Sequence, residues 1–233
     1  MKVLSMKAWN EKWKSEEGRA LWLEPASFVA SLVPKFKKEG VRKILDIGFG
    51  VGRHTILFAK EDFDVYGIDT SESGLEYANK WARKEKTTVD LELGEMSNLP
   101  FESDFFDLII AWNVLYHGIL DSIRKSIEEI RRCLKQDGYL LCSLISVKND
   151  KYGLGEEIER KTFVVAEEKE KSHPHHYFDR KEIRQCLIGF SLLRCKDAEQ
   201  FRSGDFHWDI LAKLISKDGD SKYPVPFGCN HGQ

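Results

Sequence analysis

Cysteine is scarce in this sequence, and no two cysteines form a C-x-x-C pair. The few that occur are scattered and odd in number, which disfavours a disulfide framework. They are Cys133, Cys142, Cys186, Cys195 and Cys229. We therefore expect reduced thiols and a cytoplasmic location.

Long apolar runs are also missing. No segment is long and apolar enough to cross a membrane, and residues 1–7 lack the uninterrupted apolar stretch of a signal peptide. Neither sign of charge dominates, because the formal net charge is only −2. A general electrostatic attraction to nucleic acid or to anionic lipid is therefore not expected. These absences leave a small molecule as the expected partner, and the oligomeric state stays open.

What the sequence does contain is the composition of one globular domain. Its 233 residues are 42% hydrophobic and 32% charged, which allows a sizeable core under a charged surface. We divide it into a helical lead-in over residues 1–40, a core over 41–216 and a tail over 217–233. Within the core, residues 147–178 form a strongly charged insert.

A glycine-rich turn between a strand and a helix is the most informative feature. Apolar residues flank Asp46 in a strand predicted over Lys43–Ile47, and a helix is predicted over Arg53–Lys60. Glycines let a backbone turn tightly and touch a ligand without an intervening Cβ. The turn contains three of them in alternating positions, at Gly48, Gly50 and Gly52. This arrangement predicts a nucleotide-type site at the end of a parallel sheet.

The spacing of these glycines distinguishes between nucleotides. A dinucleotide site has the pattern G-x-G-x-x-G, whereas this sequence has G-x-G-x-G, with Arg53 at the place of the third glycine. The carboxylate of Asp46 would repel a pyrophosphate but attract an ammonium or sulfonium group. S-adenosylmethionine carries both cations. An NAD(P)-dependent reductase is therefore the weaker hypothesis.

At this point the sequence resembles the class I S-adenosylmethionine-dependent methyltransferases, whose first motif has the form D-x-G-x-G-x-G. Further motifs like those of that family follow in order: a strand that ends at Asp69, then the segments 95–101, 106–117 and 131–141. Together they cover about residues 44–146. The resemblance implies a Rossmann-like α/β fold, with a seven-stranded, mostly parallel sheet, helices on both faces and a C-terminal antiparallel hairpin.

The resemblance also implies which residues bind the cofactor. The methionine end would contact Asp46, Gly48, Gly50 and Gly52, with Arg53 at the carboxylate. The remaining assignments are Asp69 and Thr70 for the ribose, Glu95 and Met96 for the adenine, and Trp112 and Asn113 beside the sulfonium. Ordinary structural roles stay open, because Asp69 can cap the next helix, Met96 can fill the core and Trp112 can pack at a strand end.

The residue pattern predicts the elements around this site. Apolar side chains at helical spacing indicate amphipathic helices over Ser71–Arg83 and Asp121–Lys135. After an Asp-Gly turn, the apolar run Tyr139–Ser146 indicates a central strand. Two later strand-like runs, Phe190–Cys195 and Phe206–Ile215, are separated by about ten residues, which is short enough for an antiparallel hairpin.

Tryptophans concentrate in the lead-in, at Trp9, Trp13 and Trp22. We expect one or two helices there, ending between Pro34 and Gly40. The tryptophans either pack these helices on the sheet or, as we consider for Trp13, close the cofactor pocket.

Histidines are the candidates for acid–base chemistry. An amine or hydroxyl acceptor must lose a proton, and a histidine with a near-neutral pKa can take it. His117 follows the fourth strand, close to the predicted methyl group, and His175 and His176 could reach the same space from the insert. In the resembled family such an insert commonly contacts the substrate. We expect no metal, because the spacing of His173, His175 and His176 fits no common helical zinc pattern.

The sequence therefore predicts a methyltransferase that uses S-adenosylmethionine, releases S-adenosylhomocysteine and acts on a small molecule. The fourth motif, Trp112–Leu115, lacks the Asn/Asp-Pro-Pro-Tyr typical of enzymes that methylate nucleobase amines. Two competing hypotheses stay open: a non-catalytic S-adenosylmethionine-binding protein, and a protein or RNA methyltransferase.

Overall fold

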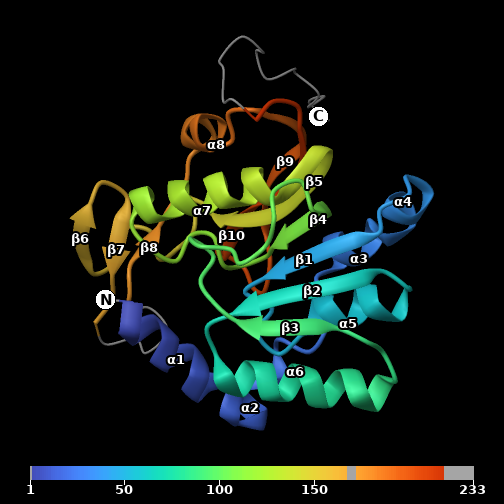
Figure 1. Cartoon of the computed structure of the whole chain (residues 1–233). Coiled ribbons are helices and arrows are strands. Elements are labelled where there is room, and N and C mark those ends of the chain that lie inside the picture. The colour runs from blue at the N-terminus through green and yellow to red at the C-terminus, as the bar shows by residue number, and fades with distance from the viewer. Residues whose placement is uncertain (1, 167–171, 218–233) are drawn as a thin grey trace.

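A seven-stranded sheet forms the centre of the chain in the computed structural model, which describes residues 2–166 and 172–217 (Figure 1). Its strands are β1 (Lys43–Ile47), β2 (Asp64–Asp69), β3 (Asp90–Leu93), β4 (Phe106–Ala111), β5 (Leu134–Ile145), β9 (Phe190–Glu199) and β10 (Phe206–Leu214). They lie in the order β3-β2-β1-β4-β5-β10-β9. The pairings from β3 to β5 are parallel, and β10 is antiparallel to both β5 and β9. The predicted fold, including the C-terminal hairpin, is confirmed.

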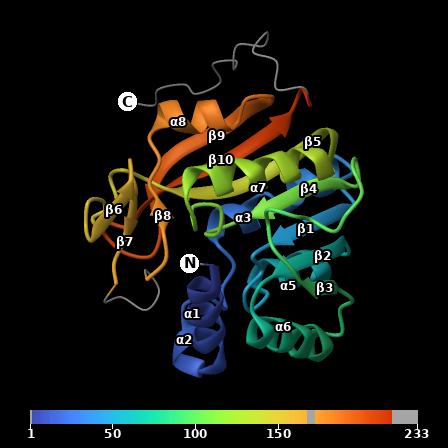
Figure 2. The same ribbon diagram turned by 60° about the vertical axis from the view of Figure 1, so that its left-hand side comes forward.

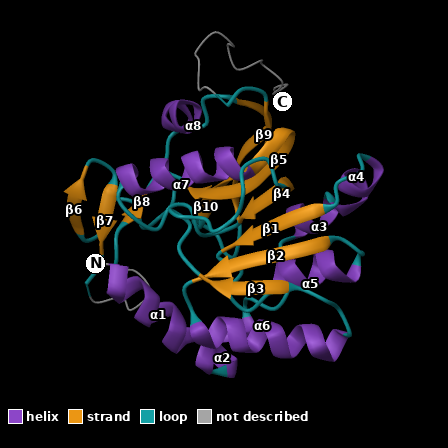
Figure 3. Cartoon of the chain, viewed as in Figure 1, coloured by secondary structure: helices purple, strands orange, loops and turns teal. Residues whose placement is uncertain are grey.

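Helices cover both faces of this sheet (Figure 3). They are α1 (Lys2–Lys14), α2 (Glu16–Ala20), α3 (Ser27–Ser31), α4 (Val33–Lys38), α5 (Arg53–Lys60), α6 (Glu72–Glu85), α7 (Leu120–Cys133) and α8 (Arg180–Cys186). The lead-in thus contains four short helices, where the sequence analysis expects one or two. Ser15 ends α1 and caps α2, and Pro34 lies in the first turn of α4, which explains the additional breaks.

The two faces of the core follow from the alternation of side chains along each strand. Ile44 of β1 and Leu108 of β4 lie in one buried cluster with apolar residues of α3, α4 and α5. Their neighbours Leu45 and Ile109 lie in a second cluster with α7 and α8. All four side chains are 0% exposed, so each contributes about 1.5–3 kcal/mol through burial. This packing fixes the strands whose ends carry the glycine-rich turn.

The strand β5 differs from the prediction at its beginning. It starts at Leu134 and includes the Asp137-Gly138 pair, which was expected to be a turn before the strand. Asp137 has a left-handed backbone (φ 65°), and the pairing register with β4 shifts between Phe106 and Leu108. The turn therefore persists as a bulge inside the strand, because the residues on both sides of it pair with β4.

The insert forms a small sheet of its own. Its strands are β6 (Glu156–Glu159), β7 (Thr162–Val164) and β8 (His175–His176), in that order and antiparallel. It is attached to the loop after β4, since the N–H of Gly118 donates to the carbonyl of Pro174 at 2.8 Å. Of the predicted tail, residues 218–233 lie outside the described part of the chain.

Strands β1 to β4 all end on the same side of the sheet, because they run parallel. Figures 1 and 2 show α1 beside this edge. Asn10 anchors α1 there, since its side-chain carbonyl accepts a hydrogen bond from the N–H of Ser73 in α6 at 2.9 Å. In the described residues we find no helix with the length and apolar character needed to span a bilayer.

Candidate active site

The loops that follow β1, β2, β3 and β4 surround a cavity of about 390 Å³. Ligands of open α/β sheets bind at this position, outside the carboxyl ends of parallel strands. Most of the predicted cofactor-binding residues lie on its wall: Gly48, Gly50, Arg53, Asp69, Thr70, Glu95, Met96, Trp112 and Asn113. Asp46 and Gly52 are not part of the wall.

Asp69 fastens the glycine-rich turn to the end of β2. Its carboxylate accepts a hydrogen bond from the N–H of Gly50 at 2.8 Å and another from the N–H of Ser71 at 2.8 Å. Burial raises the pKa of Asp69, and these N–H donors oppose the rise. The residue that caps α6 is Ser71, whose hydroxyl accepts from the N–H of Gly74 at 3.1 Å. Each oxygen of Asp69 still has a second acceptor site that a ligand hydroxyl can use.

Asp46 is buried against α5 and does not reach the cavity wall. It is 2% exposed, and its Oδ2 accepts a hydrogen bond from the hydroxyl of Thr55 at 2.7 Å. Burial raises its pKa to about 7, while Thr55 and Arg53 oppose the rise. The direct contact with the cofactor ammonium, expected from the sequence, stays a prediction.

Arg53 brings a cation to the wall at the first residue of α5. Its guanidinium lies 4.9 Å from the ring centroid of Trp22 and 3.4 Å from the carbonyl of Glu24. Burial lowers its pKa to about 10, so the side chain stays protonated near neutral pH. It can therefore bind a ligand carboxylate.

Two positions in the turn serve packing. A Cβ at Gly52 would lie 3.0 Å from the Cβ of Ala78, so this glycine allows α6 to approach the turn. The bulky Phe49 is accommodated because its neighbour in β2 is Gly67, where a Cβ would lie 2.8 Å from Cδ1 of Phe49. Gly67 compensates for the large residue between the first two glycines.

Three tryptophans form the roof of the cavity. Trp9 and Trp13, one helical turn apart on α1, stack with ring centroids 5.2 Å apart, and Trp22 meets both edge-on at 5.8 and 5.7 Å. Trp13 lies over the turn, since a Cβ at Gly50 would be 3.2 Å from its Cζ2. Trp9 reaches the opposite end, with its ring 5.6 Å from that of His117. We call these three residues the tryptophan roof.

Asn113, after β4, presents a polar group to the cavity. It has a left-handed backbone (φ 58°), and its N–H donates to the hydroxyl of Ser143 at 2.8 Å. That hydroxyl donates back to Oδ1 of Asn113 at 2.6 Å, which fixes the amide. Its Nδ2 is buried and has no hydrogen-bond partner in the described part of the chain. A ligand oxygen or nitrogen would satisfy this donor.

Met96 and Trp112 have both of the positions that the sequence left open, on the wall of the ligand cavity and in the packed core. Both line the cavity, yet Met96 also packs against the core cluster on the α7 side, and Trp112 is 6% exposed within the cluster on the α5 side. Glu95 lies beside Met96 on the wall after β3, and its contact with the adenine stays a prediction.

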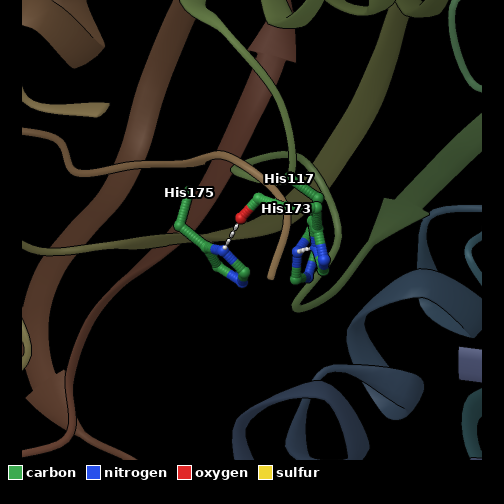
Figure 4. Close-up of side chains that lie close together, drawn as sticks. All are labelled: His117, His173 and His175. Atoms are coloured by element: carbon green, nitrogen blue, oxygen red, sulfur yellow. Dashed lines mark hydrogen bonds between the residues drawn. The ribbon is translucent and has the colours of Figure 1, made fainter. Parts of the chain in front are cut away.

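Two of the predicted histidines lie near the cavity (Figure 4). His117 lines it, and His175 is buried next to His117, with ring centroids 4.6 Å apart. His173 completes the group, because its Nε2 is 2.8 Å from Nδ1 of His117. The backbones of His117 and His175 also form a β-bridge, which holds the insert against the loop after β4.

The structure does not bring His176 to the cavity. Successive side chains of a strand point to opposite faces, so His176 faces away from His175 in β8. Its Nδ1 is 2.7 Å from the hydroxyl of Thr162, and its Nε2 is 3.2 Å from Oε2 of Glu182. Burial lowers the pKa of His176, although Glu182 opposes this. His176 is therefore not placed to act as a base in the cavity.

Several further residues line the wall without having been predicted there, among them Trp9, His54, Ser122 and Ser126. One signal was available for Trp9, because it precedes Trp13 by one helical turn and so shares its face. The serines of α7 carried no signal, since small polar residues are common on helix surfaces.

Comparisons with known proteins agree with this geometry. Residues 44–138 match the family described as the methyltransferase domain. A protein of Geobacillus sp. (strain WCH70) named as a methyltransferase is 31% identical over 134 residues, covering 57% of this chain and 53% of that protein. The uncharacterized methyltransferase YcgJ of Bacillus subtilis (strain 168) is 32% identical over 100 residues, covering 42% of this chain and 39% of that protein. The chain thus spans about half or less of these relatives.

A solved structure shows the same fold. The 1,6-didemethyltoxoflavin-N1-methyltransferase of Burkholderia thailandensis, with bound 1,6-didemethyltoxoflavin and S-adenosylhomocysteine, has a TM-score of 0.71. It is 17% identical, and the match covers 92% of this chain and 88% of that one. The glycine-rich turn and the sheet order agree with these matches: residues 44–138 are similar to the methyltransferase domain, and the chain has the fold of the class I S-adenosylmethionine-dependent methyltransferases.

Proposed function

We propose that this chain transfers a methyl group from S-adenosylmethionine to a small-molecule acceptor and releases S-adenosylhomocysteine. One observation carries the proposal: a cavity of about 390 Å³ connects the cofactor motifs, from Gly50 and Asp69, with His117 at its other end. Cofactor and acceptor can therefore meet inside one wall.

The residues on the wall fit the cofactor. Asp69 offers carboxylate oxygens to the ribose hydroxyls, and Arg53 offers a cation to the carboxylate. The cofactor supplies a methyl group on a positively charged sulfur. The protein's task in such an in-line displacement is to align the acceptor with that methyl group and to exclude water. The tryptophan roof excludes water, and the buried Nδ2 of Asn113 can orient a polar group of the ligand.

The acceptor's proton leaves at the histidine end of the cavity. His117 borders the space beside Asn113, and His175 lies behind it. We keep these two histidines as the residues that promote deprotonation of the acceptor.

A small acceptor is supported by the size and lining of the cavity. Pockets for small molecules occupy about 300–1,000 Å³ and are lined mainly by apolar and aromatic groups. This one is roofed by tryptophans, and the chain's net charge of −2 gives no attraction to nucleic acid. The similar Burkholderia enzyme holds a small molecule, 1,6-didemethyltoxoflavin, beside S-adenosylhomocysteine. The location is supported by cysteines that are free thiols: Cys133, Cys142, Cys186 and Cys195. Free thiols are typical of a reducing compartment such as the cytoplasm.

Calorimetric titration with S-adenosylhomocysteine, with NADH as the control, tests the cofactor. We expect micromolar binding of the first and none of the second. Turnover is tested separately, by transfer of labelled methyl groups from S-adenosylmethionine to a panel of amines, phenols and thiols. Binding without turnover on any acceptor would favour a non-catalytic binding protein. Transfer confined to protein or RNA would refute the small-molecule proposal.

A further inference from the structure

Three histidines from two distant parts of the chain meet at the wall of the cavity (Figure 4). His117 follows β4, whereas His173 and His175 lie at the end of the insert. One ring nitrogen of each lies within 4.8 Å of the other two. His173 and His175 flank Pro174, where the chain bends and enters β8.

Hydrogen bonds to backbone carbonyls decide which ring nitrogen carries the lone pair in two of these histidines. Nε2 of His117 is 3.1 Å from the carbonyl of Asn113, and Nδ1 of His175 is 2.9 Å from the carbonyl of His173. A carbonyl oxygen only accepts, so both of these ring nitrogens carry the proton. The lone pairs are therefore on Nδ1 of His117 and Nε2 of His175. Metal-binding histidines show this same arrangement, with the outer N–H held by a carbonyl or carboxylate.

We propose that His117, His173 and His175 bind a divalent transition metal ion of the zinc type, with an open coordination position toward the cavity. Imidazole nitrogens suit zinc, copper, nickel and iron. Three protein ligands leave a fourth position open, which distinguishes a catalytic site from a closed structural one. The position would face the cavity, because His117 and His173 line it.

The geometry requires only small adjustments. Nitrogens on a tetrahedral zinc ion at 2.0–2.1 Å are separated by about 3.3 Å. The Nδ1 of His117 and Nε2 of His173 are now 2.8 Å apart, as in a hydrogen bond. Metal binding would replace the shared proton and move them apart by about half an ångström, while the widest pair would close by up to about 1.5 Å.

The metal would supply the acceptor end of the cavity with a means of deprotonation. Neutral imidazole ligands do not reduce the double positive charge of the ion. That charge lowers the pKa of a bound water to about 7, and it also lowers the pKa of a bound hydroxyl or thiol. The acceptor's proton goes to solvent, its anion forms the new bond to the methyl carbon, and the methyl–sulfur bond breaks with its electron pair left on sulfur. The methyl transfer in this sequence of events rests on the proposed function, whereas the metal site itself does not.

Cobalt(II) titration of protein freed of metals with a chelator tests the site without any cofactor or acceptor. We expect one equivalent of Co²⁺ to bind, with visible absorption typical of tetrahedral coordination and without thiolate charge-transfer absorption. The second feature excludes binding by cysteines. Azide, a simple ligand for an open position, should change the spectrum. An unchanged spectrum with azide would overturn the open position.

Two variants remove one ligand nitrogen and keep the hydrogen bond to the carbonyl. His117→Gln places an amide N–H near the position of Nε2, and His175→Asn places one near Nδ1. We expect each to weaken Co²⁺ binding more than about 100-fold, because loss of an outer partner alone costs 10–100-fold. His176→Gln is the matched control and should bind normally. Circular dichroism and S-adenosylhomocysteine binding report on the fold of each variant.

Absence of Co²⁺ and Zn²⁺ binding in folded wild-type protein would overturn the metal site and leave a hydrogen-bonded cluster of bases. Equal binding by His176→Gln, His175→Asn and wild type would do the same. Failure of methyl transfer with intact metal binding would contradict the proposed function alone.

Discussion

Replacing Gly50 by alanine should weaken cofactor binding through the tryptophan roof. Gly50 has a left-handed backbone (φ +56°), and its new Cβ would lie 3.2 Å from Cζ2 of Trp13. The tryptophan has little freedom to retreat, because it is stacked on Trp9 and lies against Gly74, where a Cβ would be 3.1 Å from its Cδ1. The substitution therefore shifts the roof or the turn by a few tenths of an ångström.

Two effects of this substitution can be separated. A left-handed backbone costs a non-glycine residue about 1–2 kcal/mol wherever it occurs. For a chain of this size, that lowers the melting temperature by about 2–8 °C. Displacement of the roof acts only on the ligand, and a loss of about 1.4 kcal/mol there reduces affinity tenfold.

Gly40 supplies the matched control. It also has a left-handed backbone (φ +73°), but a Cβ there would meet nothing within 4 Å. We expect Gly40→Ala and Gly50→Ala to lower the melting temperature by similar amounts. Only Gly50→Ala should weaken S-adenosylhomocysteine binding in calorimetry, by about tenfold or more. Equal affinities in the two variants would refute the reasoning that the roof and turn hold the cofactor.

Two further substitutions test the carboxylates. In Asp69→Asn, the new NH₂ group must face the N–H of Gly50 or Ser71, both of which donate to the carboxylate in the wild type. We therefore expect S-adenosylhomocysteine binding in calorimetry to be at least about tenfold weaker. Unchanged affinity would remove Asp69 from the site. Asp46→Asn keeps an acceptor for Thr55 but removes a group whose folded pKa is about 7 against an ordinary 3.8. Between these two pH values the folded state binds the proton more tightly than the unfolded state, so the wild type loses stability as the pH rises. Urea unfolding at pH 4 and pH 8 measures this loss. From pH 4 to pH 8, the free energy of unfolding of Asp46→Asn should rise relative to that of the wild type by up to about 4 kcal/mol. An equal stability difference at both pH values would contradict the buried, protonated Asp46.

The sequence was sufficient for the parallel core, and the reason is local. In β1 and α5 the short apolar run of Ile44, Leu45 and Ile47 and the break at the glycines specify strand, turn and helix without help from the rest of the chain. Both elements begin and end at the predicted residues. Where tertiary contacts decide, the prediction was less accurate. The bulge at Asp137 depends on pairing with β4, which no local pattern reveals.

The candidate site shows the same division. Asp69 and Gly50 meet because β1 and β2 are neighbours, which the strand–helix–strand order implies. The sequence led us to expect His175 near His117, but it gave no reason to add His173, which is fifty-six positions from His117 and meets it through the contact between the loop after β4 and the insert. Considering His173, His175 and His176 as sequence neighbours led to an expectation of no metal, whereas strand alternation separates His176 from the other two.

The tryptophan roof also gives the protein a built-in optical reporter. The sequence has six tryptophans, of which Trp9, Trp13, Trp22 and Trp112 border the cavity. Four of the six tryptophan fluorophores therefore lie within contact distance of whatever enters the cavity. Occupancy of the cavity can be followed by emission in the unlabelled protein, in stopped-flow as well as at equilibrium, and Trp81 and Trp208, which are not part of the wall, supply a constant background.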